Sequence, residues 1–505
     1  MFPFSCSGKF FRETKILSHF ERLRMIMYIK LLSIPALLLI SAFVGATEIK
    51  ASKLDAFVES YAENDEFNGS VLVSYQGEVL LKKGYGYANM EWKIPNSVDT
   101  KFRIASTTKP LTAALILKLV EKGKIDLSHS IRDYLPGYRS DTGGKVTIHQ
   151  LLNHTSGIPN VFSHPDFKDI EANNPYSLND FISKFCSGDL KFQPGSQFSY
   201  SNAGYSILGK IIEQVTELSY KQALQDYIFN PLKMHNSGDS YSGYVVPKSA
   251  KGYEKTLGGL KPAKNIDMTV TYAAGSIYST VGDLYQFSEA LYSNQIFSEA
   301  LKKRAFTASP HRNYGYGWLI TELPKEKFGK KLTQIHHPGM MPGFNGDVIR
   351  VIEDDITIII QNNTGGAPLR ALTEGILSII YERPVVFAKK QIEDELYSKL
   401  RQDGIEAAIK SYMQLQKSNK GFSERGLNYF GYQLMEVEEI NAAIAFFELN
   451  AKQHPESSNA FDSLGEAYLA NEEFKKALIA YEKSLSLDEH NKNASEAIDK
   501  INELL

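Results

Sequence analysis

Cysteine is nearly absent from this chain of 505 residues, which contains only Cys6 and Cys186. Two thiols exclude a disulfide framework, and they exclude a zinc or iron–sulfur site built from cysteine. His149, His154 and His164 are spaced too irregularly for a helical zinc motif. We therefore expect no metal and no other cofactor.

A charge excess of either sign is also missing, since 56 Lys and Arg face 58 Asp and Glu for a net charge of −2. Without a basic stripe the sequence gives no sign of a nucleic-acid partner. With 43% hydrophobic and 23% charged residues, the composition excludes collagen-like, disordered and multi-span membrane proteins. The chain has room for two or three domains.

Long apolar runs are lacking except near the start, where residues 31–44 follow Lys30. This run is shorter than the roughly 20 residues that span a bilayer. It ends in the small residues Val44-Gly45-Ala46, which is typical of a secretory signal. We expect residues 1–46 to be a signal peptide cleaved near Ala46, with an uncleaved anchor as the alternative, and translation to start at Met25 or Met27. The mature protein would be periplasmic or secreted, with no membrane span.

Residues 47–387 mix strand-like and helical patterns. Val71–Val73 and Glu78–Leu81 predict one β-hairpin, and Gly346–Val351 and Ile356–Gln361 predict another. Residues 110–121 predict an apolar helix that stops at Gly123. Strands at both ends with helices between them predict an α+β domain, with one antiparallel sheet and a helical insert.

Residues 391–505 repeat with a period of 34. The period relates Gly431 to Gly465, Ala443 to Ala477, and Phe447 to Tyr481. Small residues that allow close helix approach, with aromatics between them, are typical of stacked helix hairpins. The region resembles two tetratricopeptide repeats and one degenerate repeat, an all-α solenoid. It either stabilises the preceding domain or binds a protein partner.

Ser106 and Lys109 are three residues apart at the start of the predicted helix, so both lie on one face. A serine becomes a useful nucleophile when a neighbour takes its proton, and a lysine does so if burial lowers its pKa. Taken alone, Ser-x-x-Lys also fits a helix cap followed by an exposed lysine.

Two further motifs follow in order. Tyr200-Ser201-Asn202 lies on a loop before an apolar helix, and His337-Pro338-Gly339 lies before a strand. With Ser106-x-x-Lys109, these motifs resemble the serine β-lactamase and penicillin-binding-protein family, in its class C-like branch. Residues 151–157 and 274–280 also resemble that branch. The chain has no Gly-x-Ser-x-Gly elbow of an α/β-hydrolase.

Two other segments of the chain also match the Tyr-x-Asn pattern. Tyr87 precedes Ser106, out of order for the family, and Tyr292 falls in a predicted helix starting at Asp283. We therefore select Tyr200. His154 is a further candidate, as the histidine of a catalytic triad. The resemblance implies instead that its segment is a structural loop.

The resemblance implies a role for each residue. Ser106 attacks a carbonyl carbon and becomes acylated, while Lys109 and Tyr200 relay its proton; which of the two is the base stays open. Asn202 orients Lys109 and the substrate. Backbone N–H groups of Ser106 and Met340 hold the oxyanion.

His337-Pro338-Gly339 stands where many relatives have Lys-Thr-Gly. Histidine is mostly neutral near pH 7, whereas lysine is a fixed cation for a substrate carboxylate. With His337 and Gly339 as substrate-binding residues, the site suits esters, amides or D-amino-acid peptides better than efficient β-lactam hydrolysis. The alternative is a penicillin-binding receptor that deacylates slowly and whose repeats recruit a partner.

Overall fold

The structure, a computed structural model, describes residues 48–167, 169–240, 244–418 and 422–504. The predicted signal peptide lies outside these ranges. Within them, no helix has both the length and the apolar character needed to cross a membrane.

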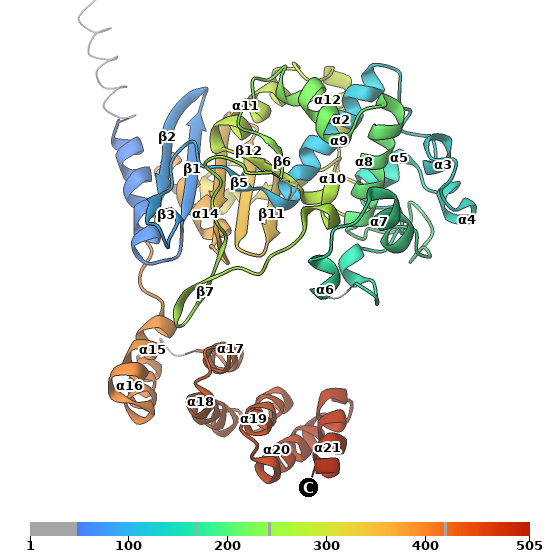
Figure 1. Cartoon of the computed structure of the whole chain (residues 1–505). Coiled ribbons are helices and arrows are strands. Elements are labelled where there is room, and N and C mark those ends of the chain that lie inside the picture. Colours follow the sequence, from blue (N-terminus) through green and yellow to red (C-terminus); the bar gives the residue numbers. More distant parts are fainter. Residues whose placement is uncertain (1–47, 168, 241–243, 419–421, 505) are drawn as a thin grey trace, which may run out of the picture.

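A six-stranded antiparallel sheet forms the centre of the first domain, in the order β10-β11-β12-β13-β1-β2 (Figure 1). The strands are β1 (Gly69–Tyr75), β2 (Glu78–Tyr85), β10 (Leu319–Leu323), β11 (Leu332–Met341), β12 (Phe344–Val351) and β13 (Ile356–Asn362). Strand β1 pairs with β13 from Gly69↔Asn362 to Tyr75↔Ile356. The two ends of the domain thus close one sheet, and both predicted hairpins are confirmed.

The sheet is buried on both faces, because successive side chains of a strand point to opposite sides. Ile358 and Ile360 pack with Phe57 of the helix over residues 48–63 and with α14 (Leu369–Ile380). Gly375 permits this approach, since a Cβ there would lie 2.0 Å from the Phe57 ring. Ile359 faces the other way, into the larger core shared with the remaining helices.

The larger core lies under the helical part of the domain. Helix α2 (Thr108–Glu121) runs through it and extends two residues before the predicted helix. The other helices are α3 (Ile131–Tyr134), α4 (Ser140–Gly143), α5 (Ile148–Leu152), η2 (Val161–Ser163), α6 (Asp169–Ala172), α7 (Leu178–Phe185), α8 (Asn202–Thr216), α9 (Tyr220–Leu224), η3 (Gln225–Phe229), η4 (Met268–Val270), α10 (Tyr272–Gly275), α11 (Val281–Tyr292), α12 (Glu299–Ala305) and α13 (Lys325–Phe328).

Three small sheets complete the domain. One pairs β3 (Tyr87–Asn89) with β4 (Ile94–Pro95), a second orders β5 (Phe102–Arg103), β9 (Ile277–Ser279) and β6 (Gly238–Asp239), and the third orders β14 (Thr364–Gly365), β7 (Tyr253–Thr256) and β8 (Gly259–Pro262).

The regular secondary structure of the C-terminal region consists of helices in its described residues, and the region has a hydrophobic core of its own. Its helices are α15 (Ile392–Asp403), α16 (Ile405–Lys417), α17 (Glu424–Glu436), α18 (Ile440–Gln453), α19 (Ser458–Ala470), α20 (Phe474–Leu487) and α21 (Lys492–Leu504). A Cβ on Gly431 would lie 2.5 Å from the Phe447 ring, and one on Gly465 would lie 2.9 Å from the Tyr481 ring. The glycine–aromatic pairs of the 34-residue period therefore make the helix contacts. Their assignment to the tetratricopeptide class stays a prediction.

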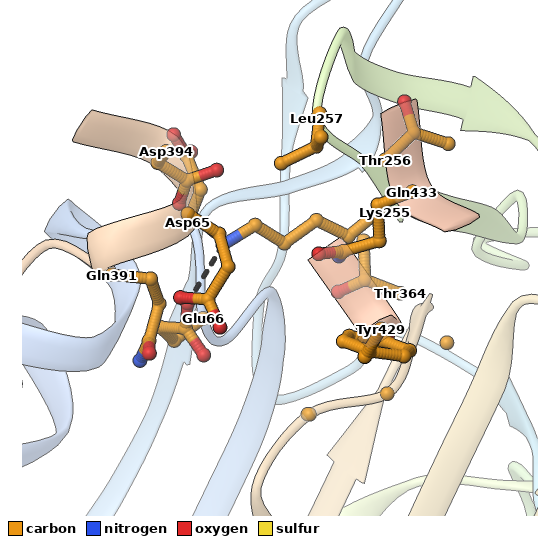
Figure 2. A pocket seen from close by; sticks show the side chains of 14 residues that line it. Asp65, Glu66, Lys255, Thr256, Leu257, Thr364, Gln391, Asp394, Tyr429 and Gln433 are labelled. Carbon is orange, nitrogen blue, oxygen red and sulfur yellow. Dashed lines mark hydrogen bonds and ion pairs between the residues drawn. The ribbon is translucent and has the colours of Figure 1, made fainter. Parts of the chain in front are cut away.

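The β7–β8 hairpin joins the two regions (Figure 1). Leu257 at its tip is buried in the core of the C-terminal helices. Figure 2 shows the Lys255 side chain pointing toward Glu66 and Asp394. Its Nζ lies 2.7 Å from Glu66 Oε1 and 3.0 Å from Asp394 Oδ2 of α15. Lys261 reaches Glu436 of α17 at 2.6 Å. The C-terminal helices are thus docked on the first domain by a shared apolar contact and by ion pairs.

Substituting Leu257→Asp tests this docking. Burying an unpaired carboxylate is unfavourable, so we expect the C-terminal helices to undock and trypsin to cleave the connecting segment at Lys389 or Lys390 at least about fivefold faster, as an opening cost of about 1 kcal/mol or more predicts. Val245→Asp is the matched control, because Val245 is 93% exposed. Equal cleavage rates in the two variants would contradict the docking role.

Candidate active site

Strand β11 presents a free edge where the site forms. Strand β10 pairs with it only from Leu332 to His336, so the end of β11 is open on that side. The turn η1 (Ala105–Thr107) packs there, and the Thr107 hydroxyl donates a hydrogen bond to the His337 carbonyl at 3.1 Å. Pro338, which has no N–H to donate, fits this stretch beyond β10.

Gly339 allows the turn and the strand to meet. A Cβ at this position would lie 2.0 Å from the Ile104 carbonyl oxygen and 3.0 Å from the Thr107 nitrogen. No side chain fits such a gap, so glycine is required. Met340 follows, with its side chain 78% exposed, and its backbone lies beside the turn that carries Ser106.

Ser106 occupies the middle of η1, directly before α2. Ala105 before it has φ +48°, a left-handed conformation that costs a non-glycine residue of order 1 kcal/mol. Together with the packing against β11, this turn leaves the Ser106 side chain partly exposed, whereas its neighbours Ala105 and Thr107 are buried.

Lys109 lies one turn later with none of its surface exposed. Its Nζ donates hydrogen bonds to Ser106 Oγ at 3.1 Å, to Asn202 Oδ1 at 2.7 Å and to the Ala274 carbonyl at 2.9 Å. Burial holds its pKa well below the ordinary value of lysine. The amine can therefore be neutral at physiological pH and accept a proton from the serine next to it.

Tyr200 lies next to both Lys109 and Ser106, with its ring centroid 4.7 Å from the Lys109 nitrogen. Burial raises the pKa of Tyr200, and a hydrogen bond with Ser106 opposes this only in part. Its side chain is therefore a neutral phenol, able to donate a proton.

Asn202 is the first residue of α8, and Asn160 holds its side chain on the side away from Lys109. Its Nδ2 and its backbone N–H both donate to Asn160 Oδ1, at 3.0 and 3.1 Å. Because the amide nitrogen is engaged there, the amide oxygen faces Lys109. Asn160 thus fixes the orientation of Asn202.

His337 is buried beside this cluster, with 2% of its surface exposed. Its Nδ1 lies 2.8 Å from the Pro338 carbonyl oxygen, and its Nε2 lies 2.9 Å from the Tyr314 hydroxyl. The same hydroxyl lies 3.2 Å from Nε2 of His154. His154 in turn accepts a bond from the Ser201 N–H on Nδ1 and packs on Tyr200, with ring centroids 4.3 Å apart.

These contacts determine the proton positions on both histidines. The Pro338 carbonyl only accepts, so His337 carries its proton on Nδ1; the Ser201 N–H only donates, so neutral His154 carries its proton on Nε2. Tyr314 then accepts from His154 and donates to His337. Burial is the main cause that holds the pKa of both histidines well below the ordinary value, and any protonation of Lys109 lowers it further. His154, Tyr314 and His337 thus form a neutral, hydrogen-bonded group of rings that packs against Tyr200.

Acid should destabilise this support. An unfolded histidine takes up a proton near pH 6.5, whereas these two stay neutral to lower pH in the folded protein. The unfolded state binds more protons below pH 6.5, so the free energy of unfolding falls there by up to about 1.4 kcal/mol per pH unit for each histidine.

Urea unfolding near pH 7 and near pH 5, followed by the fluorescence of buried Trp318, measures this. In the His154→Gln variant, the free energy of unfolding should fall less between pH 7 and pH 5, by the contribution of one histidine. His490→Gln, at a position 87% exposed, should show the same fall in the free energy of unfolding as the wild type. The interpretation fails if His154→Gln is as acid-sensitive as the wild type.

The structure brings together every residue that the sequence predicted for the site: Ser106, Lys109, Tyr200, Asn202, His337, Gly339 and Met340. The two other matches to Tyr-x-Asn lie elsewhere, with Tyr87 in β3 and Tyr292 at the end of α11. The His337 motif lies within β11 rather than only before a strand. In the described ranges, no group of His, Cys, Asp and Glu side chains could hold a metal ion.

Sequence reasoning missed three supporting residues. The motifs assign no role to Asn160 or Tyr314, and they place His154 in a structural loop without predicting its contact to Tyr200. No local motif connects them to the site, because Tyr314 and His154 are 160 residues apart. The sequence offers one weak signal for His154, which follows Asn153 in the segment 151–157 that resembles the family.

The chain matches the Beta-lactamase family over residues 54–378. It is 30% identical over 397 residues to penicillin-binding protein 4* of Bacillus subtilis strain 168, covering 71% of this chain and 85% of that protein. A crystal structure of a penicillin-binding protein from Bacillus halodurans superposes with a TM-score of 0.54 at 26% identity, covering 64% of this chain and 97% of that one. D-amino acid amidase from Ochrobactrum anthropi SV3 gives a TM-score of 0.51 at 25% identity, over 62% and 93% of the two chains.

The fold and the serine–lysine–tyrosine cluster define a serine hydrolase of the β-lactamase and penicillin-binding-protein superfamily, which works through an acyl-enzyme. Within that superfamily, the chain belongs to the Beta-lactamase family.

Proposed function

We propose that this protein is a class C-like serine hydrolase whose nucleophile is Ser106, acting on esters, amides or D-amino-acid peptides. The observation that carries the proposal is the fully buried Lys109 amine, 3.1 Å from Ser106 Oγ. Burial lowers the pKa of this amine, and a neutral amine within hydrogen-bond distance is what activates a serine.

Acylation then proceeds in two steps. Lys109 takes the hydroxyl proton while Ser106 Oγ bonds to the substrate carbonyl carbon, and the N–H groups of Ser106 and Met340 hold the oxyanion. When the intermediate collapses, the bond to the leaving group breaks. Tyr200 gives that group its phenolic proton and recovers a proton from Lys109. The net result is an acylated Ser106 and a neutral Lys109.

The directions of the two pKa shifts favour Lys109 as the base. Burial lowers the pKa of the amine and raises that of the Tyr200 phenol, so a neutral amine and a neutral phenol are the stable pair. In deacylation the same groups work in reverse, with water in place of the leaving group. Asn202 keeps Lys109 aligned through its 2.7 Å bond.

Mass spectrometry of the intact protein and its tryptic peptides tests the function. With p-nitrophenyl esters we expect turnover and a transient adduct on the peptide that contains Ser106, absent in Ser106→Ala and present in a control Ser196→Ala. A stable β-lactam adduct at Ser106 without ester turnover would favour the penicillin-binding receptor instead. No adduct with any acyl donor would overturn both.

Two further proposals concern the rest of the chain. The apolar run before Ala46 supports export and cleavage near that residue, which N-terminal sequencing of the secreted protein would establish. The 34-residue period and the glycine–aromatic contacts support tetratricopeptide-like repeats. We propose in addition that these repeats bind a protein partner.

A further inference from the structure

The β7–β8 hairpin connects the C-terminal helices to the hydrolase domain (Figure 1). Its tip carries Leu257, which is 8% exposed and belongs to the hydrophobic core of those helices. Its two strands pair over their whole length. At its base the Ala263 N–H donates a hydrogen bond to the Gly252 carbonyl at 3.0 Å. One continuous element thus contacts the C-terminal core at its tip and the hydrolase domain at its base.

The base of the hairpin packs on the turn that joins β11 to β12. A Cβ on Gly343 of this turn would lie 2.6 Å from Ala263 Cβ and 2.7 Å from Gly252 Cα. A Cβ on Gly252 would lie 2.7 Å from the Phe344 ring. Met340 precedes this turn at the end of β11, and its N–H holds the oxyanion in the proposed mechanism. The hairpin base therefore supports the stretch of chain that carries this N–H group.

The chain that follows the hairpin also reaches the active site. Ile266 lines a cavity of about 420 Å³ together with Ser106, Met340 and Pro342. A shift of the hairpin base would therefore displace the proposed oxyanion donor and one wall of the cavity at the same time.

The hairpin depends on the docked helices for its order. A hairpin of two strands is marginally stable in water unless it packs against other elements. On its other side β7 pairs with β14, a strand of two residues. The tip is held by the burial of Leu257 and by two ion pairs to the C-terminal helices, in which Lys255 reaches Asp394 (Figure 2) and Lys261 reaches Glu436. Undocking of the helices removes all three contacts.

We propose that docking of the C-terminal helices controls the activity of the Ser106 site through the β7–β8 hairpin. With the helices docked, the hairpin is ordered and its base keeps the Met340 N–H aligned with that of Ser106. With the helices undocked, the hairpin frays and the oxyanion loses one aligned donor. This inference rests on the proposed function. It follows that a partner which binds the helices only in the undocked state lowers the hydrolase activity.

Ester hydrolysis by the full-length Leu257→Asp protein tests the coupling. The oxyanion donor acts in the transition state, so we expect kcat to fall about tenfold, within the range of allosteric couplings, while KM changes little. Leu257→Met should keep the wild-type kcat, because the two side chains are similar in volume and both apolar. Val245→Asp, at an exposed position, should keep it as well.

A second measurement uses the wild-type protein, because coupling between two sites is reciprocal. A p-nitrophenyl alkylphosphonate is the probe: Ser106 Oγ bonds to phosphorus, p-nitrophenolate leaves, and Lys109 takes the hydroxyl proton. The adduct places a phosphoryl oxygen where the oxyanion forms and should favour the docked helices. After removal of excess reagent, trypsin should cleave the modified protein at Lys389 or Lys390 about fivefold more slowly. Ser106→Ala treated in the same way should show no change.

The outcomes separate this inference from the proposed function. Wild-type kcat in Leu257→Asp would overturn the inference, and so would equal trypsin cleavage of the modified and unmodified wild type. If a urea titration shows that Leu257→Asp does not fold, the cleavage of the wild type decides alone. If the phosphonate and every ester fail to modify Ser106, the proposed function itself is overturned.

Discussion

Replacing Lys109 by Met is expected to slow acylation of Ser106 by about 10³- to 10⁴-fold, the range of a lost general base acting on the nucleophile. Met is unbranched and fits the same buried path, so the change removes the amine and little else. Stopped-flow kinetics with a chromogenic ester, under single-turnover conditions, measures the acylation step directly.

The reason lies in the surroundings of the amine. None of its surface is exposed, and its bonds to Ser106, Asn202 and the Ala274 carbonyl place it in one position. Loss of the amine leaves Asn202 Oδ1 and the Ala274 carbonyl oxygen without this donor, which costs about 1–3 kcal/mol of stability for each of these two acceptors. A urea titration therefore accompanies the kinetics, so that lost activity is not confused with lost folding.

Two variants make this prediction specific. Lys109→Arg restores a cation but not a base, because a guanidinium is not deprotonated in proteins; it should not restore acylation. Lys118→Met, later in α2 and 25% exposed, should retain the wild-type rate. If Lys109→Met acylates as fast as the wild type, Tyr200 or another group is the base.

The sequence allowed the chemistry of the site to be predicted, because three short motifs each carry their own reactive groups. Ser106 and Lys109 are fixed by one helical turn, so their proximity follows from local geometry. The buried pattern of β12 and β13 likewise predicted a hairpin at the centre of the sheet.

The supporting residues could not be predicted, because only the tertiary fold brings them together. Tyr314 bonds His154 and His337 from a segment that carries no pattern of catalysis. The same holds for Leu257, whose burial depends on helices that begin more than 130 residues later.

Gly339→Ala is expected to lower kcat by about 10²- to 10³-fold, the loss found when one oxyanion donor is removed. The added methyl would lie 2.0 Å from the Ile104 carbonyl oxygen and 2.8 Å from Thr107 Oγ1. Both contacts belong to the η1 turn or its flank, so the end of β11 must move away from Ser106. The N–H groups of Ser106 and Met340 then no longer reach one oxygen at 2.7–3.1 Å, the spacing an oxyanion needs.

Steady-state kinetics on an ester separates this effect from weaker binding. Because the oxyanion forms only in the transition state, kcat should fall while KM changes little. Gly137→Ala is the matched control, since a Cβ there meets nothing within 4 Å, and it should behave as the wild type. A Gly339→Ala protein with wild-type kcat would mean that the Met340 backbone does not hold the oxyanion, and the contact of β11 with η1 would then serve stability alone.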